Sequence, residues 1–377
     1  MTQHFENLTI ERFRGLRGLE LKEMGQVNLF VGANNSGKTS VLEAISAYCR
    51  PLDALEWLNT ARRREAISGG LPTPIARLSA LRWLFPQSMQ QSQNELYHGD
   101  VEIHANGDFA VQSVFAKYQE IRGIPDETTL KRIQQRMPAR ESDSEYQGAE
   151  LQVAIKYEAR GELFPKGTMQ SNFIFWEAAP FFDRQRPPAE VTLPVRTITP
   201  VSHRTERSQI ERFSEHALNR ETANVLDLIR LFDPEILGLQ ILGAGGGGLY
   251  IDHKKSGLTP LSAFGDGLRR VVMIALTLQS VKNGVLLIDE IETAIHISVL
   301  NDVFQWLSAA CRQYKIQLFA TTHSLEAVDA LLTAYSQPKD GLVAYQLGQT
   351  GEPVKRFSGE LLNRLRSERG LDVRGQA

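Results

Sequence analysis

A run of eight residues near the N-terminus has the residue types and spacing of a phosphate-binding loop. Residues 32–39, GANNSGKT, fit the pattern G-x-x-x-x-G-K-[ST]. The apolar segment 27–31 predicts a strand before the loop, and apolar residues at helical spacing in 41–45 predict a helix after it. In that setting, backbone N–H groups of the loop and the positive end of the helix dipole face a bound phosphate.

The side chains of this loop have separate expected roles. Lys38 is predicted to reach the β- and γ-phosphates of a nucleotide, and Thr39 to bind Mg²⁺. We also expect the Lys38 side chain to be exposed when the site is empty. The residues predicted to bind the nucleotide here are Asn34, Asn35, Ser36, Gly37, Lys38, Thr39 and Ser40.

Two carboxylates and a histidine follow later apolar segments. Asp289 and Glu290 come directly after residues 285–288, VLLI, which are typical of a central parallel strand. Because ligands bind at the carboxyl ends of strands in such sheets, Asp289 is predicted to hold Mg²⁺ and Glu290 to polarise the attacking water. His323, just beyond the apolar segment 317–320, could bond the γ-phosphate or that water. The alternatives are a solvated turn for the carboxylates and a structural role for the histidine.

A fourth segment, residues 261–270, LSAFGDGLRR, precedes a predicted helix. Ser262, Gly265 and Gly267 could present a hydroxyl and backbone N–H groups to a phosphate. A serine cap and a glycine entry at an ordinary helix N-terminus explain the same residues equally well.

Composition limits the classes of protein that this chain can be. It has 377 residues, 42% hydrophobic and 23% charged, with a net charge of −2. These values are ordinary for a globular protein, and binding to nucleic acid would need a local basic patch. The two cysteines, Cys49 and Cys311, have no metal-binding spacing. With no signal peptide and no apolar run long enough for a bilayer, we expect a cytoplasmic protein without membrane contact.

The order of predicted elements indicates an α/β fold. Strands alternate with helices in residues 1–50 and 200–377, which predicts a mostly parallel sheet. Residues 51–199 are predicted to form an inserted, mixed α/β lobe with a regulatory or partner-binding role. The glycine-rich run 243–248 favours a hairpin over a second phosphate-binding loop, because no Lys-Ser/Thr pair or helix follows it.

The motifs together resemble those of the ABC-type ATPase heads. They are FRGL at 13–16, GANNSGKTSVLEAI, LSAFGDGLRR, LLIDEIETAIH and ATTHS. They are most similar to the overcoming-lysogenization-defect (OLD) class of AAA-like ATPases, kin to the SMC and RecF heads. The resemblance covers about residues 5–46 and 222–332, whereas the segment from 51 to about 200 matches no known motif. It implies a P-loop NTPase fold, ATP and Mg²⁺ as ligands, and ATP hydrolysis in a homodimer.

The resemblance also implies how the site residues are shared. The phosphate-binding loop, Asp289, Glu290 and His323 would act within one subunit. The signature loop, mapped onto Ser262, Gly265 and Gly267, would act across the dimer on the partner's γ-phosphate, although it departs from the usual Leu-Ser-Gly-Gly-Gln/Glu. Glu292 and His296 resemble a dimer-facing loop; ordinary first-turn helix chemistry is the alternative.

The biological role has several candidates. Members of the OLD class often carry a C-terminal Toprim nuclease domain, for which the chain is too short beyond His323. We therefore predict the ATPase subunit of a two-component, anti-phage-defence-like system with a separate nuclease or toxin effector. A RecF-like DNA-binding repair ATPase is the main alternative, and a transporter subunit fits the signature loop less well. Contact with DNA stays open because of three basic clusters: residues 62–64, Arg184 with Arg186, and Arg269 with Arg270.

Overall fold

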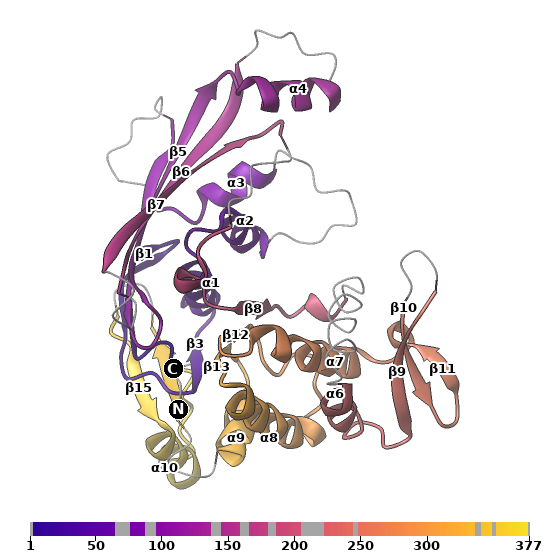
Figure 1. Cartoon of the computed structure of the whole chain (residues 1–377). Coiled ribbons are helices and arrows are strands. Elements are labelled where there is room, and N and C mark those ends of the chain that lie inside the picture. The colour runs from indigo at the N-terminus through magenta and orange to yellow at the C-terminus, as the bar shows by residue number, and fades with distance from the viewer. Residues whose placement is uncertain are drawn as a thin grey trace. The chain divides into compact units, whose positions relative to one another are not determined.

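The computed structural model forms two compact units (Figure 1). It describes residues 3–64, 76–86, 96–136, 145–158, 166–179, 186–204, 222–243, 248–335, 341–348 and 352–375. Unit 1 comprises Met1–His4, Leu21–Leu42 and Pro194–Ala377, and unit 2 comprises Phe5–Glu20 and Glu43–Leu193. The division falls inside helix α1 (Lys38–Cys49).

Unit 1 is built on a six-stranded sheet that is parallel except at one edge. Its order is β15-β14-β3-β13-β12-β8. The four parallel pairs join β14, β3, β13, β12 and β8, and only β15 runs antiparallel to its neighbour. Every residue of β3, β12 and β13 is buried, so both faces of the central strands are covered. The predicted mostly parallel sheet is confirmed. The strands are β3 (Val27–Gly32), β8 (Val195–Ile198), β12 (Val285–Ile288), β13 (Gln317–Thr321), β14 (Leu342–Leu347) and β15 (Lys355–Ser358).

The helices of unit 1 begin and end at recognisable caps. The Ser324 hydroxyl accepts the N–H of Ala327 at the start of α9, as the Ser358 hydroxyl accepts that of Leu361 at the start of α10. Helix α8 ends at Lys315, whose φ of +56° is left-handed. The helices are α6 (Thr222–Ile229), α7 (Asp266–Leu278), α8 (Ile297–Tyr314), α9 (Leu325–Ala334) and α10 (Gly359–Arg369), with short 3₁₀ turns at Ser202–Arg204, Leu261–Ala263 and Gln279–Val281.

A small antiparallel sheet completes unit 1, at the right of Figure 1. It consists of β9 (Ile236–Leu242), β10 (Gly248–His253) and β11 (Gly257–Pro260). Leu249 and Ile251 of β10 are fully buried in the main hydrophobic core of the unit. Residues 244–247 of the glycine-rich run lie outside the described residues, but β9 and β10 on either side pair antiparallel, as a hairpin requires.

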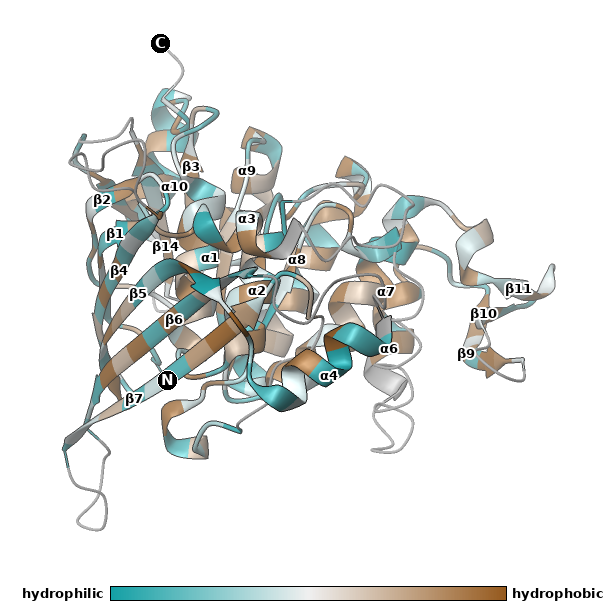
Figure 2. Cartoon of the chain, turned by 90° about the horizontal axis from the view of Figure 1, so that it is seen from above, coloured by the Kyte–Doolittle hydropathy of each residue, from teal (hydrophilic) through white to brown (hydrophobic). Residues whose placement is uncertain are grey.

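Unit 2 is built on a second six-stranded sheet, in the order β2-β1-β4-β5-β6-β7. Along β4, β5 and β6 buried and exposed residues alternate, and Figure 2 shows these strands as alternating hydrophobic and hydrophilic bands. The strands are β1 (Asn7–Phe13), β2 (Leu16–Leu21), β4 (His98–Asn106), β5 (Val111–Gly123), β6 (Tyr146–Tyr157) and β7 (Gly167–Trp176). The helices are α2 (Ala54–Arg62), α3 (Ala76–Arg82), α4 (Glu127–Arg136) and a 3₁₀ turn at Ala189–Val191.

The bounds of the two units differ from the expected domain bounds of 1–50, 51–199 and 200–377. Residues 5–20 group with unit 2 because β1 pairs antiparallel with β4, with Ile10 opposite Ile103. At the other end, residues 194–199 group with unit 1 because β8 pairs with β12. In both cases a strand joins a partner about 90 residues away in sequence. Local patterns predict that a strand exists, but they do not identify its partner.

Candidate nucleotide-binding site

The phosphate-binding loop connects β3 to α1, the strand and helix predicted around it. Gly32 has φ +144° and Gly37 has φ +90°, values that side-chain-bearing residues rarely adopt. A Cβ atom at Gly32 would also lie 2.4 Å from the carbonyl oxygen of Leu347. This glycine is therefore needed both for backbone conformation and for the close approach of β14.

Lys38 lies inside the loop rather than outside it. Its ammonium group donates to the carbonyl oxygens of Gly32, at 2.9 Å, and of Ala33, at 2.7 Å. The residue is 6% exposed, so the expectation of an exposed lysine was wrong: the loop folds around its own cation. Burial lowers the pKa of Lys38, and the nearby charges of Asp289 and Glu290 act in the opposite direction.

Asp289 is held by two threonine hydroxyls. Thr39 Oγ1, from α1, lies 3.2 Å from each carboxylate oxygen, and Thr321 Oγ1, from the end of β13, donates to Oδ1 at 2.6 Å. Among the described residues, no Lys, Arg or His side chain lies within 4.0 Å of either carboxylate oxygen. Hydroxyl and carboxylate oxygens are the hard ligands that Mg²⁺ prefers. The residues present therefore fit a magnesium ion at this edge of the sheet.

Glu290 follows Asp289 in a left-handed backbone conformation with φ +48°. Such a conformation is costly for a residue other than glycine unless its surroundings enforce it. Here its N–H donates to Thr321 Oγ1 at 2.8 Å, and its carbonyl accepts from Arg270 at 3.2 Å. Its carboxylate Oε2 accepts from the Thr293 hydroxyl at 2.9 Å. Both the backbone and the side chain of Glu290 are thus fixed.

Arg270, on α7, holds the backbone of the two strand-end acids, a contact that the sequence analysis missed. It is fully buried and donates to the carbonyl oxygens of Asp289, at 3.0 Å, of Glu290 and of Thr199. Burial lowers its pKa to about 10, a value at which it still carries its charge near neutrality. It had been grouped with Arg269 as a basic cluster, whereas it faces the protein interior. Its only signal in the sequence is a position beside the apolar run VVMIAL.

Thr321 is the second residue that the sequence analysis missed. It joins both carboxylate positions through one hydroxyl, which donates to Asp289 and accepts from the N–H of Glu290. Its position directly after the apolar segment 317–320 was the available signal.

His323 lies in the turn between β13 and α9, and its backbone is bonded on both sides. Its N–H donates to Glu292 Oε1 at 3.1 Å, and its carbonyl accepts from Arg374 Nη1 at 3.0 Å. Within the described ranges, no hydrogen bond to its imidazole nitrogens is found. The ring can therefore serve an incoming ligand, and its role stays a prediction.

The signature loop leads into α7. Ser262 is exposed in the 3₁₀ turn, and Gly265, not the serine, occupies the N-cap position. A Cβ atom at Gly265 would meet nothing within 4 Å, whereas one at Gly267 would lie 2.7 Å from the carbonyl oxygen of Ala294. Gly267 is thus required for packing and Gly265 is not. The serine-cap alternative is not what the structure shows.

The two residues of the expected dimer-facing loop have different contacts. Glu292 contacts the backbone of His323, as described above. His296 is the N-cap of α8, where its ring accepts the N–H of Ser298. First-turn helix chemistry therefore accounts for His296, while a dimer contact by Glu292 stays a prediction.

Three arginines of the basic clusters pair with acids. Arg63 pairs with Glu56 at 2.7 Å, and Arg64 pairs with Glu43 at 2.7 Å. Arg269 pairs with Asp266 at 3.2 Å. Arg184 lies outside the described residues. These arginines are largely occupied within the chain, which weakens the case for a basic face that binds DNA.

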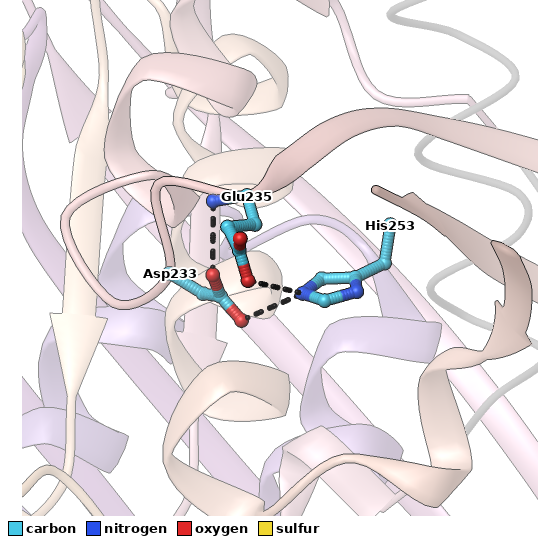
Figure 3. Close-up of side chains that lie close together, drawn as sticks. All are labelled: Asp233, Glu235 and His253. Carbon is cyan, nitrogen blue, oxygen red and sulfur yellow. Dashed lines mark hydrogen bonds and ion pairs between the residues drawn. The ribbon is translucent and has the colours of Figure 1, made fainter. Parts of the chain in front are cut away.

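A cluster of metal-binding residue types lies next to the small sheet (Figure 3). His253 Nε2 is 3.1 Å from Asp233 Oδ2 and 3.9 Å from Glu235 Oε2. Its other nitrogen, Nδ1, accepts the N–H groups of Lys255 and Ser256, both at 3.2 Å. The proton is therefore on Nε2, which is the atom that would have to bind a metal. We interpret this cluster as a set of hydrogen bonds that joins the turn at residues 233–235 to the turn at residues 253–256.

The parallel sheet, the loop around Lys38 and the strand-end acids define a P-loop ATPase head. The chain belongs to the family described as "AAA domain, putative AbiEii toxin, Type IV TA system", whose model matches residues 27–329. No helix among the described residues is long and apolar enough to cross a membrane.

Individual relatives agree with this assignment. Uncharacterized protein MJECL11 of Methanocaldococcus jannaschii is 36% identical over 114 residues, which are 29% of this chain and 99% of that protein. DNA replication and repair protein RecF of Acinetobacter baylyi is 30% identical over 125 residues, which are 32% of each protein. This chain therefore matches about a third of that RecF.

A solved structure supports the fold. The SMC head crystallised with the C-winged helix domain of ScpA has a TM-score of 0.50 at 12% identity, over 95% of this chain and 99% of that one. The expected kinship with SMC heads is thus confirmed at the level of the fold, and that with RecF at the level of a shared segment.

Proposed function

We propose that this chain binds ATP with Mg²⁺ and hydrolyses it as a homodimer with two composite sites. The observation that carries the proposal is the joint placement of Thr39, Thr321 and the two acids. One hydroxyl network fixes Asp289 beside Thr39 and holds the peptide of Glu290. This is the arrangement that a magnesium ligand and a water-orienting carboxylate require.

Each residue then has one task within its own subunit. Lys38 exchanges the loop carbonyls for phosphate oxygens, while Thr39 and Asp289 hold Mg²⁺. When bound, the ion neutralises charge on the phosphates. Glu290 orients and polarises the attacking water, and the His323 ring bonds that water or the γ-phosphate.

The signature loop completes the partner's site. Ser262 is exposed, and the space around Gly265 is open, so both can meet a phosphate from outside their own subunit. ATP would then hold two heads together and hydrolysis would release them, which makes ATP a conformational switch.

Complementation between two inactive variants tests the dimer. Lys38→Ala removes the phosphate-binding cation, and Gly265→Glu places a like charge against the partner's phosphate without a clash in its own subunit. Each should be inactive alone, and a mixture should regain part of the ATPase activity because a heterodimer holds one intact site. Gly265→Ala is the control and should stay active. If a proven heterodimer has no activity, the loop serves its own subunit.

The same switch would control a separate effector protein, a nuclease or toxin. The family description names a putative toxin and a Type IV TA system, which motivates a search for a second component. The predicted lobe, residues 51–199, which matches no motif, would supply the partner-binding surface. A pull-down from the host with Glu290→Gln as bait should recover a protein.

A RecF-like DNA-binding repair ATPase is the second candidate, because the RecF relative shares a 125-residue segment with this chain. Recovery of nucleic acid alone by the same bait, together with stimulation of the ATPase by DNA, would replace the first proposal with this one.

A further inference from the structure

The residues after α10 form a short arm that folds back onto the parallel sheet of unit 1. Gly370 ends the helix with φ +58°, which turns the chain back. Val373 is 1% exposed and belongs to the main core, and its carbonyl accepts from Gln346 of β14 at 2.9 Å. The arm, residues 370–375, is therefore anchored by burial and by a hydrogen bond.

Arg374 extends from this arm to the nucleotide site. Its guanidinium forms a two-pronged pair with Asp372, with Nε to Oδ1 at 2.9 Å and Nη2 to Oδ2 at 2.6 Å. This pair fixes the plane of the guanidinium and leaves Nη1 to donate to the carbonyl of His323 at 3.0 Å. A lysine could not make all three bonds, because it lacks the planar fork.

The His323 peptide is thus held between two distant parts of the chain. Glu292, from the loop after β12, accepts its N–H, and Arg374 donates to its carbonyl. The imidazole itself forms no hydrogen bond with the described residues, so the two backbone bonds hold the position from which the ring extends. Val373 and Gln346 already anchor the arm, so the contact of Arg374 with His323 is not needed for that purpose.

We propose that Arg374 is a positioning residue for His323, held in turn by Asp372, and that the arm thereby sets the rate of ATP hydrolysis. The inference rests on the proposed ATPase function. No motif of the nucleotide site includes residues 370–375. Because Arg374 contacts His323 rather than the phosphate-binding loop, its loss should disturb the chemical step and leave nucleotide binding intact.

Steady-state kinetics of single variants test this. Arg374→Ala should lower kcat by about 10- to 100-fold, the range expected when a supporting group far from the chemistry is lost. KM should change by less than about twofold. Asp372→Asn and Arg374→Lys should give smaller losses, because each keeps part of the fork. Arg369→Ala, an exposed arginine on α10, is the matched control and should behave as the unaltered protein. An unchanged kcat in Arg374→Ala would overturn the proposal.

A double-mutant cycle separates positioning from general loss of stability. In a His323→Ala background, Arg374→Ala should have no further effect on kcat, because the group through which it acts is gone. Equal fold losses in both backgrounds would overturn the proposal. Melting temperatures of all variants identify any that fail to fold.

An NMR measurement tests the contact between Arg374 and His323 without ATPase activity. If the chain hydrolyses no ATP, the proposed function is wrong, but this contact can still be tested. With ¹⁵N-labelled histidine, the His323 amide resonance is identified by its loss in His323→Ala. It should shift in Arg374→Ala and stay in place in Arg369→Ala. An unshifted resonance would overturn the inference independently of activity.

Discussion

Two groups of buried or half-buried carboxylates in this chain have different hydrogen-bond partners. In unit 2, Glu43 is 1% exposed and pairs with Arg14 and Arg64, both at 2.7 Å. Glu56 pairs with Arg63 and accepts from Ser46 at 2.6 Å. In unit 1, Asp289 and Glu290 instead receive hydroxyl groups, and Arg270 donates to their carbonyls and not to their carboxylates.

This is the difference that we expect between a structural acid and an acid that acts on a ligand. A buried carboxylate with an arginine partner has its charge neutralised by the fold, and removing one partner leaves the other uncompensated. A carboxylate held by hydroxyl groups keeps its full charge and its direction, so it can bind a cation or polarise water. The partners of an acid thus indicate its role better than its burial does.

The largest expected effect is on turnover. Glu290→Gln keeps the shape and a hydrogen bond but removes the carboxylate that polarises water, so ATPase activity should fall by roughly 10²-fold or more. ATP binding and melting temperature should be preserved, because no arginine partner is left behind, and the variant should accumulate as an ATP-bound dimer in gel filtration. Normal turnover would show that another residue orients the water.

For Glu43→Gln, in contrast, we expect a loss of stability. This change leaves Arg14, whose side chain is 11% exposed, without its counter-charge, and it should lower the free energy of unfolding by about 3 kcal/mol. It also removes the partner of Arg64, whose side chain is 46% exposed. Denaturant titration measures this. The control is Asp100→Asn, which breaks a pair with Arg12 in which the side chains are 36% and 40% exposed, and it should cost at most about 1 kcal/mol. If both variants lose the same stability, burial of the pair does not matter.

Asp372 is an intermediate case, a half-buried acid with an arginine partner, and its effect should be the smallest. Hydrogen bonds from the Arg374 guanidinium lower the pKa of Asp372 to about 2. A carboxyl whose pKa is lower in the folded state stabilises the fold above its unfolded pKa of about 3.9, and this contribution is lost as the pH falls toward 2. The difference in melting temperature between the unaltered chain and Asp372→Asn should therefore shrink from pH 5 to pH 2.5. A constant difference would contradict the pairing.

The strongest sequence predictions were those that depend on local patterns. The strand 285–288 was predicted with the bounds that the structure shows, and the strand and the helix predicted on either side of the phosphate-binding loop are β3 and α1. An apolar run or a helix cap depends on residues that are close together in the sequence, so the local sequence is enough to predict it. The phosphate-binding loop belongs to the same category, because one continuous segment supplies all of its atoms.

Other features depend on contacts between distant residues. The pairing of β1 with β4, the burial of Lys38, and the convergence of Arg270, Thr321 and Arg374 on the strand-end residues are of this kind. Arg270 and Arg374 have the same sequence signal as any surface arginine, and only packing places one in the interior and the other against the His323 carbonyl. The sequence by itself therefore determined which residues can do the chemistry. The tertiary structure decided which residues hold them in place, because a hydrogen-bond partner is chosen by distance in space and not along the chain.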